Sequence, residues 1–362
     1  MSRRRGRGPF LLALLLAAAG CSRREAIVAP APPAAARPVV RGEAGFLKGQ
    51  LHLHSGNSGD SATPPGEVVR WYEARGYDFI VFTDHDHVTA PPSTPSMLVI
   101  PGVELTQNLR RCDPPAPPGH ICPLHVNALF VTPPAAGVLP WGLSGGIDRL
   151  GRYRRALDTA RALGGIAQLN HPNFHDAADA PLVTALAGDG LALMEIANQA
   201  WDSNDEPRDG RPSTEALWDA VLSTGATLYG TATDDAHHYE DAAAARARGE
   251  PVFVGDLGFV MVRARKDPAA IREALVQGQF YASTGVVLGR VERTATALEI
   301  EVAADAPGPH RFTFIGRNGR LLAASDGRAA SFPLAQAAGG YVRAVIRDQR
   351  GRRAWVQPVR VP

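Results

Sequence analysis

The chain has 362 residues, of which 45% are hydrophobic, and its formal net charge is +2. This length is sufficient for one large domain and one small domain, each with its own core. Because 38 basic residues are nearly balanced by 36 acidic ones, the composition gives no electrostatic sign of a nucleic-acid partner.

Residues 1–20 have the pattern of a signal peptide. Several arginines precede an apolar core, Phe10 to Ala19, that is too short to span a bilayer. The run Ala18-Ala19-Gly20-Cys21 resembles the lipobox of bacterial lipoproteins, whose cysteine is lipidated. Residues 21–45 continue as a Pro/Ala-rich stretch, which predicts a semi-extended tether.

We therefore expect an exported protein that a lipid on Cys21 anchors to a membrane. It would face the periplasm or the cell exterior, with the outer membrane as one destination. An ordinary secretory signal with an incidental cysteine is the alternative.

Between residues 46 and 285, short apolar runs alternate with helical patterns. Expected strands cover residues 46–54, 79–84, 98–105, 125–131, 165–170, 192–196, 227–233 and 252–262. Expected helices cover residues 65–75, 147–163 and 214–223. Repeated βα units indicate a parallel sheet, and seven or eight of them indicate an α/β fold of the TIM-like barrel type.

The pattern changes after residue 285. Short alternating runs are separated by turn residues such as Pro307-Gly308 and Asn318-Gly319, and no helix signal remains. This predicts a small antiparallel β-sandwich-like domain over residues 286–362.

Cys112 and Cys122 lie in a Pro-rich stretch, residues 107–123. We expect this stretch to overhang the functional site that the histidines and carboxylates of the chain form. Export permits a disulfide between the two cysteines. The alternative is a metal site formed by both cysteines and His120, but no fourth ligand is obvious, so we favour the disulfide. Arg110 and Arg111 are either contacts for an anionic substrate or ordinary solvent-facing arginines.

Histidines and carboxylates gather where predicted strands end. In Leu51-His52-Leu53-His54, residues two apart on a strand point to the same side, so both imidazoles can reach one metal ion. The clusters Thr83-Asp84-His85-Asp86-His87 and Asp235-Ala236-His237 follow two other strands. In a barrel this end carries the active site, so the motifs together predict a metal centre. His125 departs from the pattern because it starts its strand.

The chain carries in order Gln50-Leu-His-Leu-His54 with Asp60, Thr83-Asp84-His85, Pro101-Gly-Val-Glu104, His125, Asn170-His171-Pro172 and Asp235-Ala-His237. This succession, over residues 46–285, resembles the motifs of the PHP (polymerase and histidinol phosphatase) superfamily. The resemblance implies a distorted (β/α)7 barrel, often with three metals, that hydrolyses phosphoesters. Gly49 to His52 and the passage from Ala274 to Gly285 are most similar to the carbaryl-hydrolase-like branch. Gln50 departs from the family, which usually has Asp there.

The resemblance implies three groups of metal ligands, which are His52, His54, Glu104 and Asp235; Asp60, His85 and His237; and Glu104, His125 and His171. Glu104 would bridge two ions. Asp235, His237 and Glu104 would act in catalysis through the metals, and no separate general base is assigned. Two or three divalent ions are expected, and the mixed nitrogen and oxygen ligands fit Zn, Mn or Fe.

Further residues are candidates for supporting or pocket roles. Asp84 is expected to orient a ligating imidazole. The other candidates are Asn170, His238 as a proton donor, and His87, for which a solvated turn is the alternative. For Glu195 and Asn198 a structural hydrogen bond is as plausible as substrate contact.

The number of bound ions sets the net charge of the centre, and this net charge decides whether an anionic or a neutral substrate is favoured. Three divalent ions and three carboxylates give a centre of about +3, which favours an anion such as a phosphate ester. Two ions give about +1, and a neutral carbamate, carboxylic ester or amide becomes as plausible. We expect a small, anionic substrate and a phosphoesterase that uses a metal-bound hydroxide. The alternatives are hydrolysis of a carbamate, ester or amide, and a non-catalytic, metal-containing surface binding protein.

Overall fold

The computed structural model describes residues 45–133, 139, 141 and 146–362. The predicted signal peptide, Cys21 and the tether up to residue 44 lie outside these residues. The described residues belong to one compact unit, Arg37–Pro362. None of the described helices is long and apolar enough to cross a membrane.

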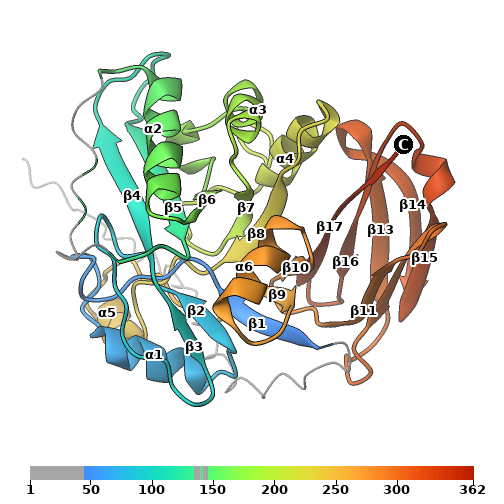
Figure 1. Ribbon diagram of the computed structural model, residues 1–362, viewed down its shortest axis with the longest axis horizontal. Coiled ribbons are helices and arrows are strands. Elements are labelled where there is room, and N and C mark those ends of the chain that lie inside the picture. Colours follow the sequence, from blue (N-terminus) through green and yellow to red (C-terminus); the bar gives the residue numbers. More distant parts are fainter. Residues whose placement is uncertain (1–44, 134–138, 140, 142–145) are drawn as a thin grey trace, which may run out of the picture. The chain divides into compact units, whose positions relative to one another are not determined.

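Strands make up three sheets (Figure 1). The nine-stranded sheet has the order β14-β13-β16-β17-β10-β9-β1-β2-β3. Its strands are β1 (Phe46–Gln50), β2 (Phe79–Val81), β3 (Leu98–Ile100), β9 (Phe259–Arg263), β10 (Phe280–Ser283), β13 (His310–Gly316), β14 (Arg320–Gly327), β16 (Gly340–Arg347) and β17 (Arg353–Val361). The five-stranded sheet consists of β4 (Gly102–Leu109), β5 (Cys122–Leu129), β6 (Ile166–Leu169), β7 (Leu193–Asn198) and β8 (Tyr229–Thr233). The three-stranded sheet consists of β11 (Leu288–Arg293), β12 (Ala297–Val302) and β15 (Ala329–Pro333).

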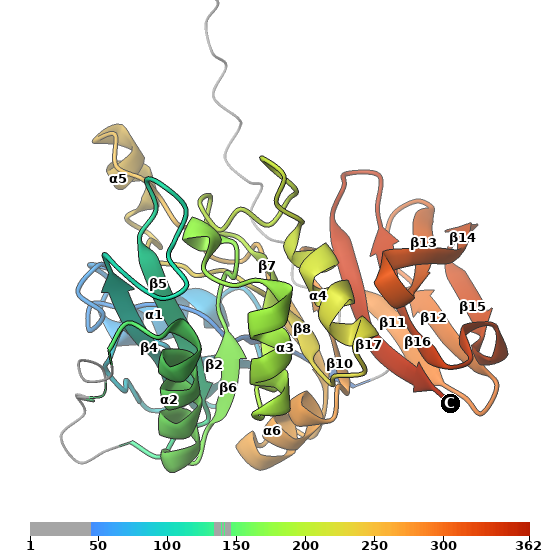
Figure 2. The ribbon, with the colours of Figure 1, turned by 90° about the horizontal axis from the view of Figure 1, so that it is seen from above.

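Helices cover the outside of the five-stranded sheet, where α2, α3 and α4 lie in a row (Figure 2). The α-helices are α1 (Pro65–Glu73), α2 (Arg149–Ala162), α3 (Ala180–Gly188), α4 (Thr214–Ser223), α5 (Ala242–Ala247) and α6 (Pro268–Val276). Three short 3-10 helices are η1 (Phe174–Asp176), η2 (Arg317–Gly319) and η3 (Leu334–Ala337). The caps are local: the Asp148 and Ser213 side chains accept hydrogen bonds from the backbone N–H of Gly151 and Ala216 at the starts of α2 and α4.

The α/β class is confirmed, but the closed TIM-like barrel is not. β4 and β5 run antiparallel as a hairpin, and β5 is antiparallel to β6 as well, so two expected βα units are missing. Isolated bridges join the two larger sheets, parallel for Leu53 with Ala236 and His85 with Glu104 and antiparallel for Thr89 with Gly102. The Gln357 side chain of β17 also forms hydrogen bonds with Gly230 of β8. No continuous ladder joins the two sheets in the described residues, so they do not form a closed barrel.

Two further differences concern element boundaries. Residues 180–188 form α3 although no helix was predicted there; Asp179 caps it and Pro181 stands in its first turn, both start signals that the sequence analysis passed over. The strand predicted from residue 252 begins only at Phe259. The preceding backbone turns around Asp234, whose carboxylate accepts hydrogen bonds from the N–H groups of residues 256–258.

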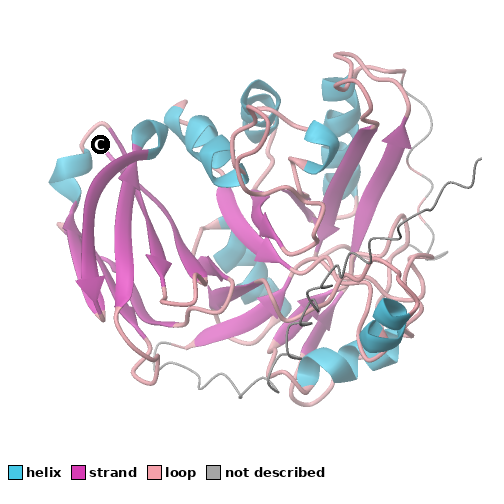
Figure 3. Ribbon diagram, turned by 180° about the vertical axis from the view of Figure 1, so that it is seen from behind, coloured by secondary structure: helices cyan, strands magenta, loops and turns pink. Residues whose placement is uncertain are grey.

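The C-terminal strands are antiparallel, as predicted, and lie beside the helix-containing part (Figure 3). Phe312, Phe314 and Phe332 are buried between their two sheets. β17 also pairs with β10 from Tyr281 to Ser283, so one ladder passes from the C-terminal strands to β1. Whether residues 286–362 are a separate domain stays a prediction.

A buried ion pair joins the C-terminal strands to the helices. The Arg343 guanidinium on β16 donates through Nε and Nη2 to the two carboxylate oxygens of Asp219 on α4, at 2.7 and 2.6 Å. Arg343 is 0% exposed, and Glu215 lies 3.3 Å away.

We predict that Arg343→Met lowers the free energy of unfolding by about 3–5 kcal/mol, because it leaves the Asp219 carboxylate buried without its cation. Urea denaturation measures this loss. Arg311→Met is the matched control: its pair with Asp326 is exposed, so it should cost about 1 kcal/mol or less. Equal losses in the two variants would contradict the role of the buried pair.

Candidate metal centre

Nine histidine, aspartate and glutamate side chains converge where the two larger sheets meet. They are His52, His54, Asp60, His85, Glu104, His125, His171, Asp235 and His237. Seven of them line a cavity of about 330 Å³, while His52 and His54 lie fully buried behind it. The structure therefore brings together every ligand that the family resemblance implied.

The antiparallel course of β5 explains the position of His125. This residue starts β5, and in a parallel barrel that would place it at the wrong end. Because β5 runs against β6, its start lies beside the end of β6, and the Asn170 backbone N–H donates to the His125 carbonyl. His125 and His171 thus lie close together, with 5.0 Å between their ring centroids.

The first group is His52, His54, Glu104 and Asp235. The Nε2 atoms of His52 and His54 are 3.2 Å apart, and each lies 3.2 Å from Asp235 Oδ1 and 3.4 Å from Glu104 Oε2. Neighbouring ligands bound at about 2.0–2.2 Å to one ion are roughly 3.0–3.6 Å apart. The Nδ1 atoms are held from behind, by Glu195 and by Ser58, so both imidazoles present Nε2. These donors fit a divalent ion.

The second group surrounds Asp60. Its Oδ2 lies 3.0 Å from His85 Nε2 and 3.2 Å from His237 Nε2, and the ring of His54 stacks on that of His237 with centroids 4.1 Å apart. Asp60 comes from the loop before α1 and its side chain is 45% exposed. This group is the most open to solvent.

The third group is Glu104, His125 and His171. Glu104 Oε1 lies 2.9 Å from His125 Nδ1 and 3.7 Å from His171 Nε2. The other oxygen, Oε2, faces His52, His54 and His85 at 2.9–3.4 Å. The two oxygens of Glu104 thus face different groups of donors, which is the geometry of a bridging carboxylate.

The protonation of these side chains shows how strong the local field is. Burial alone would raise the pKa of Glu104, but the imidazoles of His85, His52 and His125 bring it well below its usual range. Burial lowers the pKa of His54 to about 3, helped by the neighbouring His237. At His52 burial also lowers the pKa, but the facing carboxylates of Asp235, Glu195 and Glu104 outweigh it. The pKa of His52 is therefore raised. Glu104 therefore stays ionised at neutral pH, and its two oxygens are available as ligands for a cation.

Glu195 is the main support of the first group. It is 0% exposed, and its Oε1 lies 2.7 Å from His52 Nδ1. Its Oε2 accepts from the backbone N–H of His171 at 2.6 Å and from Asn198 Nδ2 at 2.8 Å. His171 has a φ of 22°, a left-handed conformation that is strained for this residue, and Glu195 helps to hold it.

Asp84, which was predicted to orient a ligating imidazole, forms no hydrogen bond with one in the described residues. The carboxylate of Asp84 accepts hydrogen bonds from Ser55 and Thr89 and so shapes the loop after β1. The role belongs to Glu195, for which a structural hydrogen bond had been one of two open readings. Its contact with His52 spans 143 residues, so no local motif indicates it.

The other candidates have different surroundings. Asn170 Nδ2 donates to Glu104 Oε1 at 2.8 Å and fixes the bridging carboxylate. His238 lines the cavity and stacks on Phe253, whereas half-buried His87 is not among the residues that line it. Phe174, Phe253 and Asp202 also line the cavity, although no motif in the sequence marks them as site residues.

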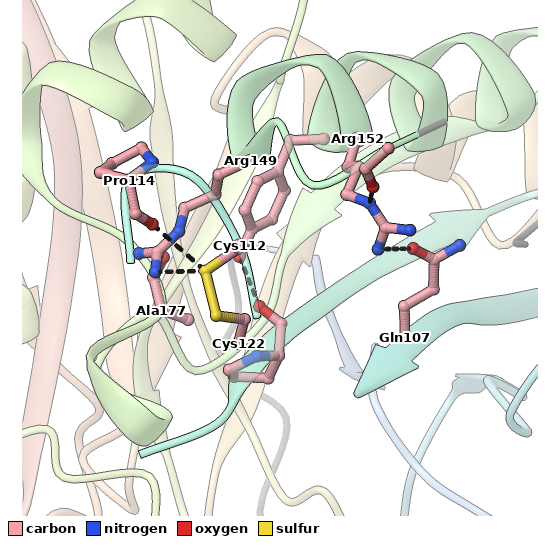
Figure 4. The surroundings of a disulfide bond; sticks show 10 residues. Gln107, Cys112, Pro114, Cys122, Arg149, Arg152 and Ala177 are labelled. Atoms are coloured by element: carbon pink, nitrogen blue, oxygen red, sulfur yellow. Dashed lines mark hydrogen bonds between the residues drawn. A yellow bond between two sulfur atoms is a disulfide. The ribbon is translucent and has the colours of Figure 1, made fainter. Parts of the chain in front are cut away.

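Cys112 and Cys122 form a disulfide, which excludes the alternative metal site with His120 (Figure 4). Two arginines of α2 hold this stretch: Arg149 Nη2 donates to Cys112 Sγ at 2.9 Å, and Arg152 Nη1 donates to Gln107 Oε1 at 2.5 Å. Arg110 and Arg111 are exposed and do not line the cavity, so the structure gives them no contact with a substrate there.

Comparison with protein-family models finds no match, and no curated protein matches the sequence. Among solved structures, the chain is similar to a two-domain protein from Bacteroides vulgatus that is described as containing a predicted PHP-like metal-dependent phosphoesterase. The two chains are 18% identical, the match covers 91% of this chain and 100% of that one, and the TM-score is 0.46. A likeness of this size carries no argument about function, so the candidate centre rests on its own geometry.

We predict that Glu195→Gln weakens metal binding about 10–100-fold, because an amide orients the His52 ring less firmly than a carboxylate does. Titration of the purified protein with Zn²⁺ or Mn²⁺, followed by calorimetry, measures the effect. Glu73→Gln removes a carboxylate that bonds only Thr94 and Ser96 in the described residues, and it should leave the affinity unchanged. Unchanged affinity in both variants would remove Glu195 from the centre.

Proposed function

We propose that the protein is a PHP-type, metal-dependent hydrolase and that phosphoesters are its substrates. The observation that carries this proposal is the position of Glu104, whose two oxygens face separate groups of imidazoles. Divalent ions held by these residues would lower the pKa of a coordinated water to about 7 and would polarise a phosphoryl or carbonyl oxygen.

The chain itself supplies binding and orientation. The first group would hold one ion at the buried end of the cavity, Asp60 with His85 and His237 a second at its open side, and His125 with His171 a third. Glu195 and Asn170 keep His52 and Glu104 in place. Phe174 and Phe253 in the cavity wall limit the access of bulk water.

Charge favours a phosphoester only if three ions are bound. Four carboxylates line the cavity, because Asp202 joins Asp60, Glu104 and Asp235, and none of the described lining residues is Lys or Arg. Three divalent ions then give about +6 − 4 = +2, and two give about +4 − 4 = 0. With two ions the neutral carbamate, ester or amide is the better substrate, and this second candidate is favoured by the absence of a lining cation.

A non-catalytic, metal-containing surface protein is the candidate of another class. The assembled ligand set argues against it, because a centre without turnover is under no constraint to keep every donor. The hydrogen bonds of Glu195 with His52 and of Asn170 with Glu104 also argue against a non-catalytic protein.

We predict that the purified protein contains two or three divalent ions and hydrolyses p-nitrophenyl phosphate. His52→Ala/His54→Ala should reduce kcat/KM at least about 100-fold, because the first ion loses two of its ligands. His310→Asn, far from the centre in β13, is the matched control and should keep the activity. Metal analysis and a chromogenic panel of phosphate, carboxylic ester and carbamate substrates check this. A fully metallated protein that cleaves none of them above the double variant would favour the binding protein.

We also propose that the protein is exported and held to a membrane through Cys21. The disulfide supports export, since disulfides persist in oxidising compartments.

We predict that Cys21→Ala moves the protein from the membrane to the soluble fraction, because it removes the site of lipidation. Fractionation of bacteria that express the full chain, with Cys21→Ser as a second variant, measures the distribution. Retention of both variants in the membrane fraction would show that another segment anchors the chain.

A further inference from the structure

A second cavity lies far from the metal centre in the fold. It has a volume of about 550 Å³ and is bounded by β17, β11 and β12 on one side and by β9 and the α6–β10 turn on the other. Phe46, at the start of β1, also lines it, whereas His52 and His54 follow the end of that strand. Ligand pockets typically have volumes of about 300–1,000 Å³, and this cavity falls in that range.

The charged side chains that line this cavity are all positive. Arg263, Arg293 and Arg360 line it, and none of its described lining residues is Asp or Glu. A neighbouring cavity of about 530 Å³ shares Arg293 and Arg360 and adds Arg317. Within the described residues, none of these four arginines forms an ion pair with a carboxylate.

Backbone carbonyls hold these guanidinium groups in place. Arg263 Nη2 donates to the Val291 carbonyl at 2.8 Å, Arg360 Nη1 to the Leu222 carbonyl at 2.8 Å, and Arg293 Nη2 to the Arg360 carbonyl at 3.5 Å. A guanidinium has five N–H donors, so most of the donors of Arg263 and Arg293 remain for another partner. Burial is the main cause that lowers the pKa of Arg360; Tyr341 and Tyr229 oppose this shift, and the nearby Arg317 adds a smaller lowering effect.

Arg290 shows that the pattern is local. It lies on the same strand, β11, but is bound by Glu292 and Glu299, at 2.6 and 2.8 Å. Three residues further on, Arg293 faces the cavity without an acidic neighbour in the part of the chain that the structure describes.

The rest of the wall combines apolar and neutral polar side chains. Phe46, Phe280, Leu298 and Val359 supply apolar surface, and the polar side chains are Tyr229, Gln277, Gln279 and Gln357. An inorganic ion would leave this apolar surface unused. A molecule with an anionic head and an apolar body would satisfy both the arginines and the apolar wall.

We infer that this cavity is a binding site for a small amphiphilic anion, an alkyl phosphate or a carboxylate, bound by Arg263 and Arg293. The site is separate from the metal centre and does not depend on the hydrolase proposal. Bidentate arginine–oxyanion bonds would hold the head, and the apolar body would lie against Phe46 and Phe280.

Calorimetric titration of the full chain with hexyl phosphate tests this inference, with inorganic phosphate and hexanoate as parallel probes. We expect hexyl phosphate to bind, and Arg263→Gln/Arg293→Gln to weaken its binding at least about tenfold, since each lost charge-assisted hydrogen bond costs about that factor. Arg290→Gln removes the same charge from β11 outside the cavity and should bind like the native chain. The proposed hydrolase would act on hexyl phosphate in all of these variants alike, so the contrast between them, repeated with hexanoate, which has no ester bond, isolates the cavity.

Each other outcome overturns part or all of the inference. Equal binding of hexyl phosphate by the double variant and by Arg290→Gln would remove the site. Equal affinities for inorganic and hexyl phosphate would remove the apolar part of the ligand. A double variant that loses sedimentation with anionic vesicles, but not hexyl phosphate binding, would replace the free ligand with a membrane surface.

Discussion

The buried carboxylate of Glu104 is the interaction on which the arrangement of the centre depends. It is 1% exposed, and such burial would normally drive a carboxyl group to its neutral form. Five imidazoles lie within 3.7 Å of its two oxygens and keep it ionised. Those imidazoles come from both larger sheets, so the charge of one residue in β4 draws the ends of β1, β2, β5 and β6 together. Asp235 has the same effect between His52 and His54, and Asp60 between His85 and His237. In the described residues, however, only Glu104 has imidazoles of all three groups within 3.7 Å.

The sequence predicts the chemistry of the centre better than its architecture. Leu51-His52-Leu53-His54 and Asp235-Ala236-His237 are contiguous, and their side-chain directions follow from strand geometry alone. The direction of β5 does not follow from its own residues, because parallel and antiparallel strands share the same apolar composition. His125 therefore looked misplaced until the hairpin with β4 was known. The same ambiguity made a closed barrel the natural expectation.

Local sequence motifs do not predict contacts between distant segments of the chain. Glu195 meets His52, and Arg343 meets Asp219, across more than a hundred residues in each case. The pairing of β17 with β10 likewise has no local signal, because the residues of a strand do not indicate which distant strand it pairs with. Helix α3 is different: its cap and its proline were visible, but its short apolar run lacked the periodic stripe on which helix prediction relies.

The isolated bridges between the two larger sheets have a consequence for motion. At the site, the His54 N–H donates to the Ala236 carbonyl and the Asp86 N–H to the Glu104 carbonyl, whereas the described strands of the two sheets form no continuous ladder with each other. Metal ions bound by ligands from both larger sheets would hold the two sheets together at this point. Loss of the ions would then favour local opening between the two sheets rather than unfolding of the whole chain, and it would appear as faster amide exchange at residues 54 and 86 while α4 and β16 stay protected.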